Sequence, residues 1–127
     1  MFDQTWCVFK KDSFPSDDFN DAVRVAKKNG VRIAYTNEVF ELWYLLHFCY
    51  CDTAITRQDY EDRLSQHMNH KYCKESEIIF DEIFERQKLA IQNAKRLLKT
   101  YNPSKPCDDN PSTTVHLLVE QLNRFSQ

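Results

Sequence analysis

The sequence predicts an α/β protein with an N-terminal β-α-β unit and a short parallel sheet, followed by a predominantly helical C-terminal half. Two observations predict the β-α-β unit. Apolar and β-branched residues gather over 4–9 and 31–35, and the residues between them have apolar positions at helical spacing. A third observation predicts the helical half, because apolar stripes at helical spacing recur after residue 37. The 127 residues are expected to form a single domain.

Two strand-like segments and the helix signals between them predict the β-α-β unit. Residues 4–9, QTWCVF, predict a short buried strand. Ser16 or Asp17 can cap the helix that follows, and Asn29-Gly30 is a typical helix stop. Residues 31–35, VRIAY, alternate and predict the second strand. A strand, a helix and a strand within about 30 residues form a β-α-β unit, whose strands lie parallel.

Four helices are expected in the rest of the chain. Residues 37–47 are apolar nearly all round, which predicts a helix in the core. Thr56 with Asp59 forms a pattern typical of a capping box at the start of the next helix. Residues 75–100 are predicted to form the longest helix, with an apolar stripe of Phe80, Ile83, Phe84, Ile91, Ala94 and Leu98. A Pro-rich loop over 102–112 leads into the last helix.

Two parallel strands form an incomplete sheet, because parallel sheets are normally covered on both faces and have more strands. The edges are expected to be closed by dimerisation, by further extended segments or by helices. A symmetric homodimer is the simplest of these solutions, since one patch then serves both subunits.

Composition excludes several classes of function. Gly30 is the only glycine, so the chain contains neither a glycine-rich phosphate loop nor a dinucleotide-binding fingerprint. The 17 basic and 19 acidic residues give a net charge of -2, which provides no overall electrostatic case for nucleic-acid binding. No apolar stretch approaches the about 20 residues of a membrane span, and no signal-peptide pattern opens the sequence, so we expect a cytoplasmic protein without membrane contact.

The cysteines raise the question of a metal site. Their number, five, is odd, and reduced thiols are expected in a cytoplasmic protein. His47, Cys49 and Cys51, with His70 or Cys73, are a conceivable set of zinc ligands, but their spacing differs from that of zinc knuckles. Residues two apart on a helix also point in different directions. Ordinary buried thiols are therefore the favoured interpretation, and we expect no cofactor.

Four residues are candidates for chemistry. Asp12 follows the first strand, where α/β proteins place ligand groups, and is either a cation ligand or a solvated loop acid. Asn37, Glu41 and His47 are polar positions in an apolar segment. Glu41 is either a buried carboxylate bonded to a lysine or the backbone, or a functional group. His47 is either a hydrogen-bonded core histidine or a functional group.

Further candidates for binding are basic or polar residues. Together with Asn37, they are Lys10, Lys11, Lys71, Lys74, Asn110 and Thr113. Lys71 and Lys74 flank Tyr72 in a small basic-aromatic cluster, for which ordinary surface lysines are the alternative, because a few cations bind phosphate weakly. The Asn110–Thr113 segment is either a helix cap or a phosphate site at a helix N-terminus.

The order of several segments resembles the RloB-like family, which is found beside bacterial restriction and defence genes and is related to the Toprim fold. The matching segments, in family order, are CVFKKDSFP, IAYTNEVFELWYLLHF, KYCK, AIQNAK and NPSTTVHLLVEQL, and they cover nearly the whole chain. The resemblance implies a metal-dependent nuclease. In Toprim-type enzymes an acid on an earlier strand and an Asp-x-Asp pair after a later strand hold Mg²⁺ for phosphoryl transfer.

Residue by residue, the resemblance leaves one metal-binding carboxylate. The second aspartate of the pair matches Asp12, and the first falls on Lys10. The strand that carries the earlier acid is expected to lie before residue 1, and Asp3 is the only acid in residues 1–9. A lysine in place of the first aspartate repels the cation by ~4 kcal/mol per cation charge, at ~4 Å and an effective dielectric of ~20. The other matched positions are Glu41, His47, Asn110 and Thr113.

These observations favour a shortened relative that retains the helical half and lacks part of the metal motif. The first hypothesis is a non-enzymatic binding protein in bacteria–phage conflict that inhibits a host defence nuclease complex, of the anti-CRISPR or anti-restriction type. The second is an active Mg²⁺-dependent nuclease in which Asp12, Glu41 and His47 form a rearranged site. The third is a nucleic-acid-binding accessory domain that uses Lys10, Lys11, Lys71 and Lys74. Metal-dependent cleavage and salt-sensitive nucleic-acid binding separate the three.

Overall fold

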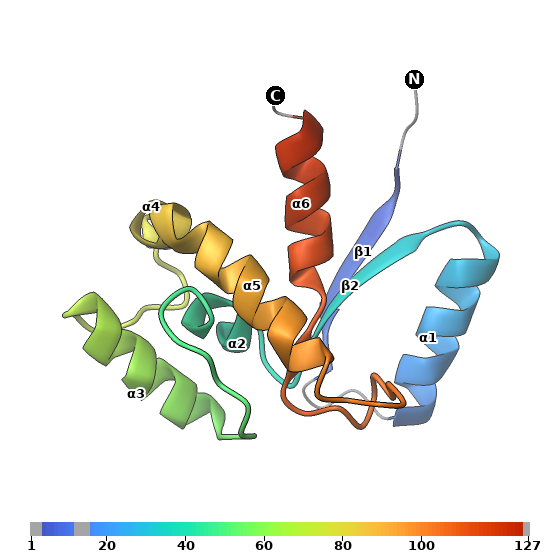
Figure 1. Ribbon diagram of the computed structural model, residues 1–127, viewed down its shortest axis with the longest axis horizontal. Helices are drawn as coiled ribbons and strands as arrows, with labels where there is room; N and C mark the ends of the chain where they lie inside the picture. Colours follow the sequence, from blue (N-terminus) through green and yellow to red (C-terminus); the bar gives the residue numbers. More distant parts are fainter. Residues whose placement is uncertain (1–3, 12–15, 126–127) are drawn as a thin grey trace.

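The computed structural model describes residues 4–11 and 16–125, and its N-terminal part is the expected β-α-β unit (Figure 1). The unit consists of β1 (Trp6–Lys10), α1 (Ser16–Lys28) and β2 (Arg32–Asn37). The elements that follow are α2 (Glu41–Leu45), α3 (Arg57–Met68), α4 (Ile79–Ile83), the 3₁₀ helix η1 (Phe84–Arg86), α5 (Gln87–Leu98), β3 (Ser112–Thr113) and α6 (Val115–Phe125). The predicted fold class is confirmed: a β-α-β unit precedes a mostly helical half.

The sheet has the strand order β1-β2-β3, so β2 lies in the middle. β1 pairs with β2 in parallel, from Trp6 opposite Arg32 to Lys10 opposite Thr36. β3 pairs with the end of β2 in the antiparallel direction, with Asn37 opposite Ser112. The sheet is therefore mixed. The sequence did not identify β3 as a strand, but an added extended segment was one of the expected ways to close a sheet edge.

The expected strand over 4–9 differs from β1 in its burial. β1 begins at Trp6, and its Cys7 and Val8 side chains are exposed. The physical reason is that β1 is an edge strand: among the described strands, it pairs with β2 alone. An apolar run of this length does not distinguish an edge strand from a central one.

Helix α1 ends where the sequence predicts and covers one face of the sheet. Gly30 has a φ of 70°, in the left-handed region that favours glycine, and the Val31 N–H donates to the Ala26 carbonyl at 2.8 Å. Phe19 of α1 is fully buried and packs edge-on against Phe9 and Tyr35, with ring centroids 5.4 and 5.5 Å apart. This aromatic contact ties the helix to both parallel strands.

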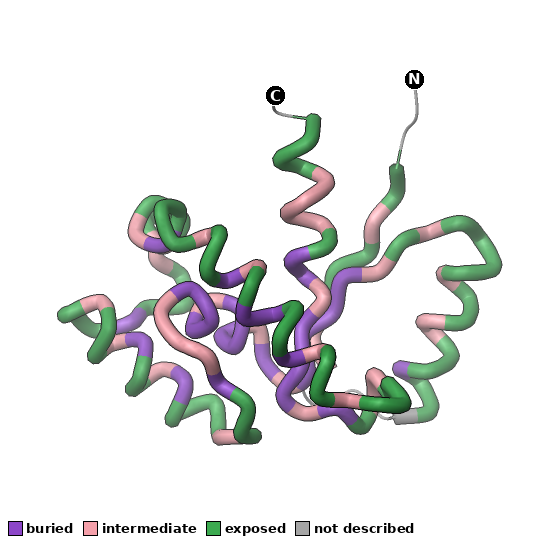
Figure 2. The backbone as a smooth tube through the Cα atoms, viewed as in Figure 1, coloured by how far each residue is buried: buried purple, intermediate pink, exposed green. Residues whose placement is uncertain are grey.

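The main core gathers around α2. Figure 2 shows buried stretches of β2, α2 and α5 meeting near the centre, while the last turns of α6 are more exposed. The buried apolar side chains include Ala34, Leu42, Leu45, Leu46, Leu64, Ala94 and Leu97. The predicted burial of the 37–47 segment is thus confirmed, but its regular helix covers only Glu41–Leu45. A segment that is apolar all round predicts burial and carries no period to fix the helix length.

The predicted continuous helix over 75–100 is wrong. The chain instead forms α4, turns through η1 and continues as α5. Phe80 and Phe84, which were expected in one apolar stripe, are 58% and 53% exposed, whereas Ile83 and Ala94 are buried. The apolar spacing of three and four residues continues across a 3₁₀ turn, so the pattern does not reveal the change of direction.

The N-termini of α3 and α6 can be compared with the sequence predictions. The predicted capping box is confirmed, because the Asp59 N–H donates to Thr56 Oγ1 at 3.1 Å and the Thr56 N–H donates to Asp59 Oδ2 at 3.3 Å. The last helix starts later than expected, at Val115, because Ser112–Thr113 is drawn into the sheet as β3.

Leu46→Ala tests the core around α2. Leu46 is fully buried, so the substitution is expected to lower the free energy of unfolding by about 2–5 kcal/mol, through lost burial and the cavity left behind. Urea denaturation measures this loss, and Val25→Ala on the exposed face of α1 is the control, with an expected change within about 0.5 kcal/mol. Equal effects of the two substitutions would contradict the assignment of the core.

Candidate functional site

The C-terminal end of β2 brings together two polar segments that lie far apart in the sequence. The hydroxyl oxygens of Thr36 and Thr113 are 3.0 Å apart and buried. The Asn37 side-chain amide donates to the carbonyls of Pro106 and Cys107, at 3.2 and 3.3 Å. Two of the predicted site residues, Asn37 and Thr113, therefore meet here, and both fasten the Pro-rich loop to the sheet.

Several neighbours strengthen this attachment. The Tyr35 N–H donates to Thr114 Oγ1 at 3.0 Å, and the Thr114 N–H donates to the Tyr35 carbonyl at 2.9 Å. Burial raises the pKa of Tyr35 to about 12, so its hydroxyl stays protonated. Asp109 is buried in the loop and accepts from the Lys105 N–H at 2.8 Å. Asn110 is half-buried two residues before β3.

Glu41 is a buried carboxylate with a side-chain partner. Its Oε2 accepts a hydrogen bond from the Tyr72 hydroxyl at 2.8 Å. Burial first, and then the hydrogen bond to Glu41, raise the pKa of Tyr72 well above its ordinary value. The Tyr72 N–H donates to Ser65 Oγ of α3 at 2.8 Å. Glu41 thus joins α2 to the segment after α3, through a tyrosine rather than the lysine or backbone group that the sequence suggested.

His47 is buried just after α2 and is held within its own turn. Its Nδ1 lies 2.9 Å from the Trp43 carbonyl oxygen, and its ring packs edge-on against the Trp43 ring, with centroids 4.9 Å apart. Burial lowers the pKa of His47, so the imidazole is neutral at neutral pH. Because a carbonyl only accepts, Nδ1 carries the proton and Nε2 is the acceptor.

His47 lines a cavity of about 250 Å³ between α2, α4, η1 and α6. Other lining residues are mostly aromatic or aliphatic: Phe40, Trp43, Tyr44, Ile79, Ile83, Val115 and Val119. Phe80 and Phe84 also line it, and their rings lie 5.3 Å apart on the protein surface. We call Phe80 and Phe84 the aromatic surface. Sequence periodicity missed it, because the same pattern describes a buried stripe.

The predicted lysines occupy two places. Lys10 and Lys11 lie at the end of β1, and the Lys11 N–H donates to the Thr36 carbonyl at 2.9 Å. Lys71 and Lys74 are exposed after α3, but the Tyr72 ring between them is buried and offers no open face to a nucleic-acid base. Asp12 lies outside the described residues.

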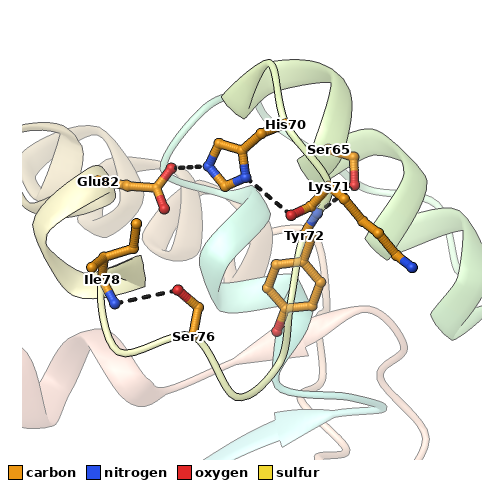
Figure 3. A network of polar contacts seen from close by, with 7 residues as sticks. All are labelled: Ser65, His70, Lys71, Tyr72, Ser76, Ile78 and Glu82. Atoms are coloured by element: carbon orange, nitrogen blue, oxygen red, sulfur yellow. Dashed lines mark hydrogen bonds and ion pairs between the residues drawn. The ribbon is translucent and has the colours of Figure 1, made fainter.

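An ion pair holds α4 against the segment after α3 (Figure 3). His70 Nε2 lies 2.5 Å from Glu82 Oε2, and His70 Nδ1 lies 3.0 Å from the Lys71 carbonyl oxygen. Two acceptors around one ring favour the imidazolium, and the hydrogen bond to Glu82 is the main cause that raises the pKa of His70. The pair thereby positions α4, which carries part of the aromatic surface.

The cysteines are all free thiols with different exposures. Cys51 is buried, Cys49 and Cys107 are half-buried, and Cys7 and Cys73 are exposed. Of the cysteines that were weighed as zinc ligands and expected to be buried thiols, Cys51 is buried and Cys49 is half-buried, whereas Cys73 is exposed. Over residues 4–11 and 16–125, no three His, Cys, Asp or Glu side chains gather as a metal-binding group. In the same part of the chain, none of the helices has the length and apolar character needed to cross a membrane.

The geometry defines an α/β protein whose polar candidate residues are largely engaged in internal contacts. A family model described as RloB-like protein matches residues 1–122, and the chain belongs to the RloB-like family, as its motifs predicted. The match extends from the β-α-β unit into α6. No curated protein and no solved structure gives a significant match to the chain.

Tyr72→Phe tests the structural role of Glu41. Removing the hydroxyl leaves a buried carboxylate oxygen without its donor, so we expect the free energy of unfolding to fall by about 1–3 kcal/mol. Glu41→Gln keeps an acceptor for the tyrosine and is expected to be milder. Chemical denaturation of both variants checks this, and an unchanged stability of Tyr72→Phe would count against the assignment.

The His70–Glu82 pair predicts a pH dependence of stability. Because the pKa of His70 in the folded protein lies above its ordinary value of about 6.5, the stabilisation is complete below about pH 6.5 and is lost as pH rises through the raised pKa. The stability difference between the wild type and His70→Gln should therefore shrink on going from about pH 6 to about pH 9. The buried His47 and His116, whose lowered pKa values act in the opposite direction, are common to both proteins. A difference that is constant with pH would contradict this role.

Proposed function

We propose that this RloB-like protein is a non-enzymatic binding protein that acts in bacteria–phage conflict by occupying a surface of a host defence nuclease complex. The aromatic surface is the observation that carries the proposal. Its two side chains, Phe80 and Phe84, are 58% and 53% exposed, and their ring centroids lie 5.3 Å apart. Large apolar side chains grouped at the surface mark interaction sites, and aromatic residues are frequent anchors of protein interfaces.

The cavity beside the aromatic surface supports the same proposal. It offers about 250 Å³ next to Phe80 and Phe84, with a mostly apolar lining. A pocket of this kind can receive an apolar side chain of a partner, which is how interface anchors gain most of their binding energy. The ion pair between His70 and Glu82 holds α4 in place, so the surface is organised before the partner arrives.

The contacts of the candidate catalytic residues favour binding over catalysis. Glu41 accepts from Tyr72, and His47 donates to the carbonyl of its own turn. A general base must reach a proton of the substrate, whereas Glu41 and His47 are both buried, with Glu41 Oε2 and His47 Nδ1 bonded within the protein. Lys10 stands where the family resemblance expects a metal-binding carboxylate.

Membership of the RloB-like family supports the defence setting, because the resemblance places such proteins beside restriction and defence genes. We propose an inhibitor of the anti-restriction or anti-CRISPR type that acts in the bacterial cytoplasm. A homodimer is compatible with this role, provided that the aromatic surface remains open to the partner.

Phage plating on a host that carries a restriction or CRISPR system tests the proposal. Expression of the protein is expected to raise the plating efficiency, and Phe80→Ser/Phe84→Ser is expected to abolish that gain at an unchanged melting temperature. Phe125→Ser, 66% exposed on α6 and away from the cavity lining, is the matched control and should keep the gain. Mg²⁺-dependent cleavage of nucleic acid by the purified protein, lost in Glu41→Gln, would instead establish the nuclease hypothesis.

A further inference from the structure

A second and larger groove lies on the other side of α6 from the His47 cavity. It has a volume of about 720 Å³ and is lined by α1, by residues 30–33 and Tyr35, by Pro106 and by α6. Figure 1 shows α1 and α6 flanking β2, which passes between them. Grooves of this size fall within the range of about 300–1,000 Å³ that is typical of ligand sites.

The groove has an apolar floor. Val23 comes from α1, Val31 directly precedes β2, Ile33 lies in β2, and Leu117 comes from α6. Leu117 is exposed although it is large and apolar, so this floor remains open along α6. An occupant with apolar side chains would remove that surface from water, which favours binding.

Basic side chains from three separate elements line the same groove. Lys27 lies in the last turn of α1, Arg32 begins β2, and Arg124 lies near the end of α6; all three are exposed. Glu120 is the only carboxylate among the lining residues that the structure describes, and its Oε2 lies 3.0 Å from Lys95 Nζ. Among the lining residues that the structure describes, three basic side chains face one carboxylate, so their net charge is positive and complements carboxylates.

The aromatic residues of the groove argue against nucleic acid as its occupant. The Arg32 guanidinium lies over the Trp6 ring, 5.8 Å from its centroid. The Tyr35 ring packs edge-to-face with Phe19, and Tyr35 is buried. Single-stranded nucleic acids bind largely by stacking bases on open aromatic faces. Here Arg32 lies over one face of the Trp6 ring and Tyr35 is buried, so the described residues offer little surface for stacking. An aliphatic floor below basic side chains fits an acidic polypeptide better.

We propose that this groove binds an acidic amphipathic segment of a protein partner, with apolar side chains on the floor and carboxylates paired to Lys27, Arg32 and Arg124. The proposal goes beyond the proposed function. It concerns a surface made by α1, β2 and α6, whereas the aromatic surface belongs to α4 and η1. The two surfaces can thus be removed by separate substitutions.

A labelled model peptide tests the proposal on the full chain. The probe is a fluorescent amphipathic peptide with leucines on one helical face and glutamates on the other, and the matched peptide has glutamine in place of each glutamate. Fluorescence anisotropy is expected to give at least about tenfold tighter binding of the acidic peptide, with a difference that shrinks as salt is added. Equal binding of the two peptides, or no binding at millimolar concentration, would overturn the proposal.

Charge-reversal variants locate the binding. Lys27→Glu/Arg124→Glu is expected to weaken binding of the acidic peptide at least about tenfold. Lys88→Glu/Lys99→Glu makes the same change in net charge at exposed positions of the α5 region outside the groove, and should leave the Kd nearly unchanged. Leu117→Gln, which alters the apolar floor without changing the charge, should weaken both peptides. Equal effects of the two charge-reversal variants would overturn the assignment to this groove.

Two further outcomes assign the groove to another occupant and overturn the proposal. One is tighter binding of a single-stranded oligonucleotide than of the acidic peptide, weakened by the same groove variant. The other is a dimer in light scattering that Lys27→Glu/Arg124→Glu dissociates. Phe80→Ser/Phe84→Ser is expected to keep peptide binding, so failure of the plating test and failure of this proposal are distinguishable.

Discussion

Strand β2 forms hydrogen bonds with three separate segments, namely β1, β3 and the Pro-rich loop. The positions of the other elements depend on these bonds. The strand pairs with β1 on one edge and with β3 on the other, while the Thr36 and Asn37 side chains bind residues 106–113. Its last four residues are buried, so each polar group there needs a partner within the protein. The Pro-rich loop supplies these partners, and α6 begins where the loop leaves the sheet.

The change of direction at η1 decides which apolar residues remain at the surface. A continuous helix would have carried Phe80 and Phe84 on the same stripe as Ala94. The 3₁₀ turn instead leaves the two aromatic rings beside the His47 cavity, and the His70–Glu82 pair holds α4 there. The exposed aromatic surface thus lies where α4 meets η1, next to the ion pair that links α4 to the segment after α3.

The two candidate surfaces differ in chemistry, which suits contacts with different parts of a partner. The aromatic surface joins a small apolar cavity, whereas the groove between α1 and α6 combines an aliphatic floor with three basic side chains. A protein that occupies a larger complex gains affinity and selectivity when such sites act together. In contrast, four of the candidate site residues form hydrogen bonds within the protein and stabilise the scaffold that presents these surfaces. They are Glu41, His47, Asn37 and Thr113.

The sequence by itself determined the family, the β-α-β start, the helix stop at Gly30, the capping box at Thr56 and the burial of the α2 segment. These features are local: they rest on turn residues, caps and apolar content within a few positions. Only the tertiary structure decided that β3 joins the sheet, that Tyr72 is the partner of Glu41, and that Phe80 and Phe84 face solvent. The first two outcomes are contacts between residues that are distant in sequence, and the third depends on where the helical segment changes direction. A periodic pattern of apolar residues contains neither kind of information.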